Sequence, residues 1–139
     1  MEYPISINGK KFEKMQLASS FEELENALCH EELPENGGVI TVFPEEDRLY
    51  FWMKHIPHDI DVVFVNNRNR IVAQKQMKAE APQAENESEE SYEKRLRTYS
   101  SGCPARIAID FRAGTLEKLN LKTGSLFPTD LTRLFKREK

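Results

Sequence analysis

A chain of 139 residues is long enough to bury the core of one ordinary domain, and 39% hydrophobic with 31% charged residues is a globular composition. The net charge of -3 and the lack of a long basic segment argue against nucleic-acid binding. No stretch approaches the roughly 20 apolar residues of a membrane span, no signal-peptide pattern opens the chain and the cysteines are sparse, so we expect a cytoplasmic protein without a membrane partner.

A capping-box pattern at Ser20–Glu23 predicts the start of a helix. The Ser20 hydroxyl would accept the amide N–H of Glu23, and the Glu23 carboxylate would reach back to the Ser20 N–H. Pro34 and the glycines that follow it would end the segment. Apolar residues at helical spacing predict the buried face of this helix: Phe21, Leu24, Ala27 and Leu28.

Strand patterns follow the helix. The β-branched run Val39–Phe43 predicts one strand, Pro44–Asp47 a turn, and Leu49–Lys54 a second strand. Both faces of the second strand carry large side chains, so we expect it to be a central strand that is covered on both sides. Its predicted faces are Leu49, Phe51 and Met53 on one side, and Tyr50 and Trp52 on the other.

A predicted hairpin comes next, because Ile60–Val65 and Arg70–Met77 flank an asparagine-rich turn. Arg106–Phe111 alternates as a further strand, followed by a short helix at Thr115–Asn120 and a last strand through Leu126–Phe127. In the Arg106–Phe111 strand, we expect Ile107, Ile109 and Phe111 to face inward and Arg106, Ala108 and Asp110 to lie on the opposite face.

A glutamate-rich segment interrupts the strands, and we expect a polar insertion at about residues 78–98. Its second half, Ser88–Tyr99, places Tyr92, Leu96 and Tyr99 at helical spacing, which predicts a short amphipathic helix. This insertion is either a lid over one end of the sheet or a solvated excursion.

Together the patterns predict a mainly β (α+β) protein: a small β-barrel or sandwich with an N-terminal helix, a short C-terminal helix and a polar, partly helical insertion. We expect residues 1–139 to form a single domain with a core at about 17–127. The basic residues 133–139 would form a solvated tail.

The most specific motif is Phe51–Lys54 (Phe-Trp-Met-Lys), followed by Asp61–Phe64 (Asp-Val-Val-Phe). With other segments in order, over roughly residues 17–127, it resembles the bacterial and archaeal family called domain of unknown function 192. The resemblance implies a small β-barrel or sandwich entered by a helix, and no established activity. The loop from His55 to Asp59 departs from the family pattern. The other matching segments are Leu24–Leu28, Glu32–Gly38, Val42–Pro44, Tyr99–Ser100, Pro104–Arg106, Ala113–Gly114 and Leu121–Gly124.

A binding platform is one interpretation of the tryptophan strand. Trp52 and Lys54 would share a face, and Arg106 on a neighbouring strand would add a second cation suited to a carboxylate or phosphate. In the alternative, Trp52 fills the core and Arg106 forms a buried ion pair with Asp61 or Asp110. The predicted ligand-binding residues are Trp52, Lys54, Asp61, Tyr99 and Arg106.

No catalytic or metal-binding motif stands out, and we predict no metal and no cofactor. His55 and His58 lie near two aspartates, but the intervening Pro57 prevents a regular helical pair of ligands. Cys103 precedes a proline and could act as a nucleophile, although an inert thiol is the simpler interpretation.

We therefore expect a β-rich binding or accessory module for a small polar or anionic ligand or a partner protein. The alternative is a small hydrolase or thiol enzyme that uses Cys103 or the loop with His55 and His58. A third hypothesis is a homodimer formed by edge-strand pairing with Ser88–Tyr99 at the contact, rather than a monomer.

Overall fold

The fold combines three β-sheets with three α-helices. The computed structural model describes the backbone of residues 1–138 and the side chains of residues 1–136. The strands are β1 (Ile5–Ile7), β2 (Lys10–Phe12), β3 (Lys14–Ala18), β4 (Gly37–Asp47), β5 (Tyr50–Phe51), β6 (Ile60–Val65), β7 (Ile71–Met77), β8 (Tyr99–Ser100) and β9 (Ala105–Arg112). The helices are α1 (Phe21–Leu28), α2 (Glu89–Arg95), α3 (Thr115–Leu119) and the 3-10 helix η1 (Thr132–Glu138).

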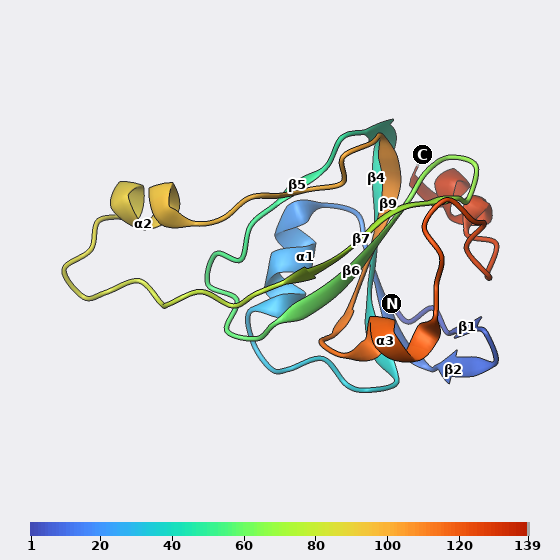
Figure 1. Cartoon of the computed structure of the whole chain (residues 1–139), viewed down its shortest axis with the longest axis horizontal. Helices are drawn as coiled ribbons and strands as arrows, with labels where there is room; N and C mark the ends of the chain where they lie inside the picture. Colours follow the sequence, from blue (N-terminus) through green and yellow to red (C-terminus); the bar gives the residue numbers. More distant parts are fainter. Residues whose placement is uncertain (139) are drawn as a thin grey trace.

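The main sheet has five strands in the order β3-β4-β9-β6-β7, with β3 and β4 parallel and the other pairs antiparallel. Figure 1 shows α1 on one side of this sheet and the β1–β2 hairpin with the C-terminal segment on the other. The sheet has edges at β3 and β7 and does not close into a barrel. The predicted mainly β, α+β class is therefore confirmed, whereas the barrel form is wrong.

Each face of the main sheet buries its own apolar cluster, which is why β6 and β9 are buried on both sides. The first cluster lies under α1 and includes Leu24, Leu28 and Phe64. The second lies under β1, β2, α3 and the C-terminal segment, and includes Phe12 and Phe111. The predicted orientation of Ile107, Ile109 and Phe111 is confirmed, since all three belong to the second cluster.

Two predictions around the tryptophan are wrong. Pro44–Asp47 continues β4 through an irregular register instead of forming a turn, and only Tyr50–Phe51 of the predicted Leu49–Lys54 strand is extended. That strand pairs with β8, a strand of two residues, outside the main sheet. The aromatic run has high β-propensity, but strand length is set by the available partner, and β8 offers only two residues.

The C-terminal predictions are also corrected. Leu126 forms an isolated bridge with Arg70, so no last strand is formed through Leu126–Phe127. The basic tail is not simply solvated, because Leu134 is 1% exposed in the second cluster and Phe135 packs against it. The two apolar residues Leu134 and Phe135 anchor this part of the segment, while Arg133 and Lys136 beside them are exposed. Lys139 lies outside the described residues.

The polar insertion forms an arm that carries α2 away from the sheet (Figure 1). We use the name arm for residues 78–98. The predicted amphipathic helix is confirmed over Glu89–Arg95, with Ser88 as its N-cap. The three spaced apolar residues are buried: Tyr92, Leu96 and Tyr99. Only Tyr92 lies in the helix, since Leu96 is its extended C-cap and Tyr99 belongs to β8, so the helix is shorter than predicted.

Candidate functional site

Asp61 holds the start of α3. Its Oδ2 atom accepts the backbone N–H groups of Gly114 (2.9 Å) and Leu116 (3.0 Å), and its Oδ1 atom accepts the Gln76 side-chain amide. The residue is 3% exposed. A buried carboxylate that accepts two backbone N–H groups acts as a cap for the helix. Asp61 therefore stabilises the fold at this position and makes no ion pair with Arg106, the alternative weighed from the sequence.

Arg106 ties β9 to β4. Its Nε–H donates to the Phe43 carbonyl at 2.5 Å, a terminal N–H donates to Asn67, and the guanidinium lies 4.3 Å from the centre of the Phe135 ring. The Asp110 carboxylate has no hydrogen-bond partner, so the suggested Arg106–Asp110 pair is not formed either. The guanidinium is engaged by a backbone carbonyl, an amide and a ring.

Lys54 joins the tryptophan segment to the arm. Its ammonium lies 2.5 Å from the Glu93 carboxylate, 3.4 Å from Glu89 and 5.5 Å from the centre of the half-buried Trp52 ring. The hydrogen bond to Glu93 is the main cause that raises the pKa of Lys54 above its ordinary value. A cation held this way has little capacity left for an anionic ligand.

Tyr99 lies at the base of the arm. Its hydroxyl accepts the backbone N–H of Lys78 at 3.0 Å, and the Arg97 guanidinium lies 4.9 Å from the ring centre. Of the five predicted binding residues, the structure brings Trp52 and Lys54 together. It engages the other three in contacts at separate places: Asp61, Tyr99 and Arg106.

Two exposed aromatic side chains lie beside Trp52. Phe21 is 40% exposed and Tyr50 is 57% exposed, and both line two hollows of about 450 Å³ and about 140 Å³. We call this surface the aromatic groove. The larger hollow is lined by Phe21, Phe43, Pro44, Glu45, Asp47, Arg48, Leu49 and Tyr50. The smaller is lined by Phe21, Leu24, Glu25, Leu28, Tyr50, Phe51, Trp52, Ile56 and Met77.

The start of α1 positions the groove. The Ser20 hydroxyl accepts the Glu23 N–H at 3.2 Å, as predicted, but the Glu23 carboxylate accepts the N–H of Ser19 (2.8 Å) and not that of Ser20. Phe21 is thus the first helical residue and projects over β4 and β5. Its ring centre lies 4.9 Å from Phe43 and 5.2 Å from Phe51. The predicted burial of Phe21 is wrong, because its ring packs on Phe43 and Phe51 but is not covered on its other side and stays 40% exposed.

A further hollow, of about 320 Å³, lies between the arm and the loop after Trp52, and we call it the arm hollow. The backbone N–H of His55 donates to the Tyr92 hydroxyl at 2.9 Å, and the two rings lie 5.1 Å apart. The backbone of His55 is left-handed, with φ of 58°. The arm hollow is lined by Met53, His55, Ile56, Pro57, Glu80, Pro82 and Tyr92.

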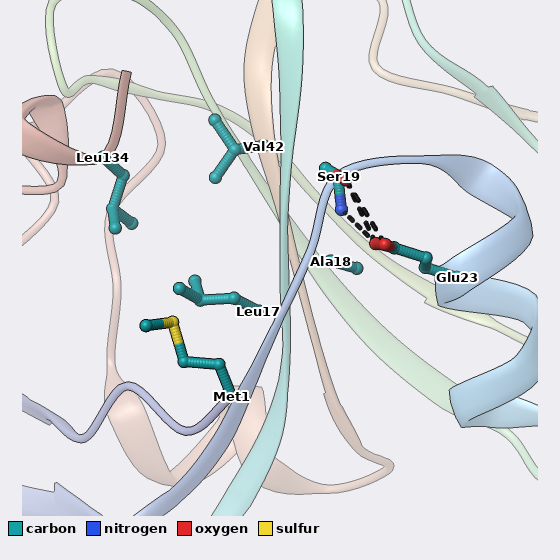
Figure 2. Close-up of a pocket in the computed structure, with 7 residues that line it drawn as sticks. All are labelled: Met1, Leu17, Ala18, Ser19, Glu23, Val42 and Leu134. Atoms are coloured by element: carbon teal, nitrogen blue, oxygen red, sulfur yellow. Dashed lines mark hydrogen bonds between the residues drawn. The ribbon is translucent and has the colours of Figure 1, made fainter. Parts of the chain in front are cut away.

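Figure 2 shows another hollow, of about 320 Å³, between the start of α1 and the C-terminal segment. Its walls are mostly apolar and include Leu17, Val42 and Leu134. Its one carboxylate, Glu23, points to Ser19 and is hydrogen bonded to it. This arrangement caps α1 and uses the Glu23 carboxylate within the fold.

Chemical groups for catalysis remain scattered. Cys103 is an exposed free thiol and Cys29 is half-buried. Among the side chains that the structure describes, those of residues 1–136, no three from His, Cys, Asp or Glu form a group that could hold a metal ion. Over the same residues, no helix combines the length and apolar character needed to cross a membrane.

The family is decided by a match over most of the chain. A model of the family described as uncharacterized ACR, domain of unknown function 192 (DUF192), matches residues 4–127. The chain belongs to the DUF192 family. The resemblance drawn from Phe51–Lys54 and Asp61–Phe64 is therefore confirmed. The match begins at residue 4, so the DUF192 domain includes the β1–β2 hairpin as well.

Two solved structures share the fold of this DUF192 chain. A Sinorhizobium meliloti 1021 protein proposed to be a transcription regulator is 19% identical, with a TM-score of 0.63 over 88% of this chain and 87% of its own. A Novosphingobium aromaticivorans protein of unknown function is 20% identical, with a TM-score of 0.66 over 90% of this chain and 83% of its own. No curated protein matches the chain significantly. At these identities the likeness shows the fold alone.

Proposed function

We propose that this DUF192 domain is a binding module that docks a segment of a partner protein in the aromatic groove. The observation that carries the proposal is the exposure of Phe21 and Tyr50, at 40% and 57%, between two hollows. Large exposed aromatic side chains beside pockets are typical of protein interfaces, where Tyr and Trp contribute much of the binding free energy. The segment would insert apolar side chains on either side of the Phe21–Tyr50 pair.

The charge of the groove favours a basic segment. Three carboxylates line the two hollows, from Glu25, Glu45 and Asp47, against the single cation of Arg48. The cations once expected to attract an anion are engaged elsewhere: Lys54 with Glu93, and Arg106 with the Phe43 carbonyl. Electrostatic complementarity therefore favours a partner with Lys or Arg next to its apolar anchor.

The groove is also held in one shape. Phe21 packs on Phe43 and Phe51, and Phe51 in turn packs edge-on against Phe64 in the first cluster. Rings fixed in this way lose little conformational entropy when a partner covers them.

Calorimetric titration with three matched peptides tests the proposal. The first is acetyl-Gly-Arg-Phe-Arg-Gly-amide, the second replaces each Arg by Glu, and the third replaces Phe by Ala. The first should bind most tightly, because only it offers both the aromatic anchor and the positive charge. If the Glu peptide binds as tightly as the first peptide, the charge argument is wrong. If the Ala peptide binds as tightly as the first peptide, the groove is not the site that takes an aromatic anchor.

Two variants with matched exposure locate the binding. Tyr50→Ala should weaken the first peptide about tenfold, as expected for an interface aromatic residue. Leu126→Ala is the control, because Leu126 is also 57% exposed but lies outside the groove. Similar losses in the two variants would contradict the proposal.

A further inference from the structure

We infer that the arm hollow is a second binding site, separate from the aromatic groove, and that it takes a small organic cation with a flat apolar body. Ile56 is the one residue that lines both the arm hollow and the groove. The ligand chemistry follows from the walls of the hollow, its one charged group and the way the arm is fixed.

The arm is fixed at its tip by Arg95. The guanidinium donates to both carboxylate oxygens of Glu87, at 2.7 and 2.9 Å, and to the carbonyls of Ala81 and Pro82, at 3.1 Å each. These bonds hold Pro82, one wall of the hollow, against α2. The hollow is therefore largely preformed, as ligand sites usually are.

The arm is fixed to the body on its other side. The Tyr92 hydroxyl accepts the His55 N–H, and Glu93 pairs with Lys54, so consecutive residues of α2 hold consecutive residues of the loop. His55 keeps a left-handed backbone that residues other than glycine rarely adopt. Such a conformation persists where surrounding contacts determine it, and it is frequent at ligand sites.

Glu80 supplies the charge. It is half-buried, and one carboxylate oxygen accepts the backbone N–H of Arg97 at 2.8 Å. In the described part of the chain, Glu80 forms no ion pair within 4 Å, and the hydrogen bonds of Arg95 go to other groups, although the Arg95 guanidinium is near enough to interact electrostatically with the Glu80 carboxylate. A partly desolvated carboxylate with a free oxygen at the wall of a hollow attracts a cation.

The remaining walls define the body of the ligand. Met53 and Ile56 are buried and apolar, Pro57 and Pro82 add apolar pyrrolidine rings, and the planar His55 imidazole lies beside the planar Tyr92 ring. Apolar walls that include two planar rings, beside a carboxylate, suit an aromatic or cyclic ammonium or amidinium compound.

Three probes that share the same aromatic ring and differ in charge separate the effect of charge from that of shape: benzylammonium, benzyl alcohol and benzoate. The protein would carry 13C-methyl methionine, because its four methionines report different places. Met53 lines the arm hollow, and Met77 lines the groove. Benzylammonium should shift the Met53 signal at the lowest concentration and benzoate at the highest. An unmoved Met53 signal, or equal responses to the three probes, would overturn the inference.

Two conservative variants test the assigned roles. Glu80→Gln keeps an oxygen for the Arg97 N–H but removes the charge, so benzylammonium should bind about fivefold more weakly and benzyl alcohol should be unchanged. His55→Asn tolerates the left-handed backbone but removes the ring, so all three probes should weaken alike. Unchanged benzylammonium binding in Glu80→Gln would refute the site. The peptide titrations with Tyr50→Ala do not involve Glu80, so the two proposals can fail independently.

Discussion

Asp110 gives the sharpest test of the packing. It lies in β9 at the centre of the main sheet, opposite Val39 on β4 and Val62 on β6, and it is 0% exposed. Among the described residues, neither carboxylate oxygen has a hydrogen-bond partner. Burial raises the pKa of Asp110 well above its ordinary value of 3.8, because the charged form would lose its hydration without compensation.

The sign of the pH dependence follows from this shift. The folded state holds the Asp110 proton at pH values where the unfolded chain has released it, so the contribution to stability is complete below pH 3.8 and is lost as pH rises. Each pH unit between the unfolded and folded pKa values costs up to about 1.4 kcal/mol of unfolding free energy. Asp110→Asn removes the titration and leaves a buried amide of similar shape.

Urea unfolding of both proteins at several pH values measures the effect. Near pH 4 the variant should resemble the wild type, since a protonated carboxyl and an amide are similar there. Towards pH 7 the variant should become more stable than the wild type, by an amount that grows with pH. A difference that stays constant between about pH 4 and about pH 7 would refute the assignment of Asp110 as a buried, unpaired acid.

Three further predictions test other parts of the molecule. Thr41→Val should raise the unfolding free energy by about 1 kcal/mol, because the buried hydroxyl has no partner; an unchanged urea midpoint would contradict this. Asp61→Ala should lower the unfolding free energy, measured by thermal unfolding, by about 2 kcal/mol, because two backbone N–H groups at the start of α3 lose their acceptor. A loss below about 0.5 kcal/mol would argue against the cap. The hydrogen bond to Arg95 lowers the pKa of Glu87 from 4.5 to about 2. The Glu87–Arg95 pair therefore contributes its full stabilisation of the arm above pH 4.5, and this contribution is lost as pH falls through about 2. Amide hydrogen exchange in α2 should show that loss in the wild type and not in Glu87→Gln.

Local patterns predicted the elements whose causes are local. The capping box found the start of α1, and the asparagine-rich turn found the β6–β7 hairpin, where Asn69 takes a φ of 61°. The N-terminal strands escaped prediction, because the segment is rich in lysine and β3 gains its partner, β4, from across the helix. Strand pairing between segments that are distant along the chain leaves little pattern in the residues of either segment.

The candidate site was predicted only where its residues are close in sequence. The proximity of Trp52 and Lys54 could be expected, but Glu93, the partner of Lys54, lies 39 residues away in the insertion. Arg106 pairs with a backbone carbonyl, which no sequence motif encodes. Helical periodicity placed Phe21 in the core because it shows which face of α1 the residue lies on, but not whether a neighbouring segment covers that end of the helix.

The central claim is that a basic segment with an aromatic anchor docks in the aromatic groove of this DUF192 domain. Trp52 is the only tryptophan and lines that groove, so its fluorescence reports the site without any label. Titration with acetyl-Gly-Arg-Phe-Arg-Gly-amide should move the Trp52 emission to shorter wavelength as water leaves the indole, and Tyr50→Ala should shift the titration to higher peptide concentration. Calorimetric binding of the peptide with an unchanged Trp52 emission would place it elsewhere on the molecule and contradict the account.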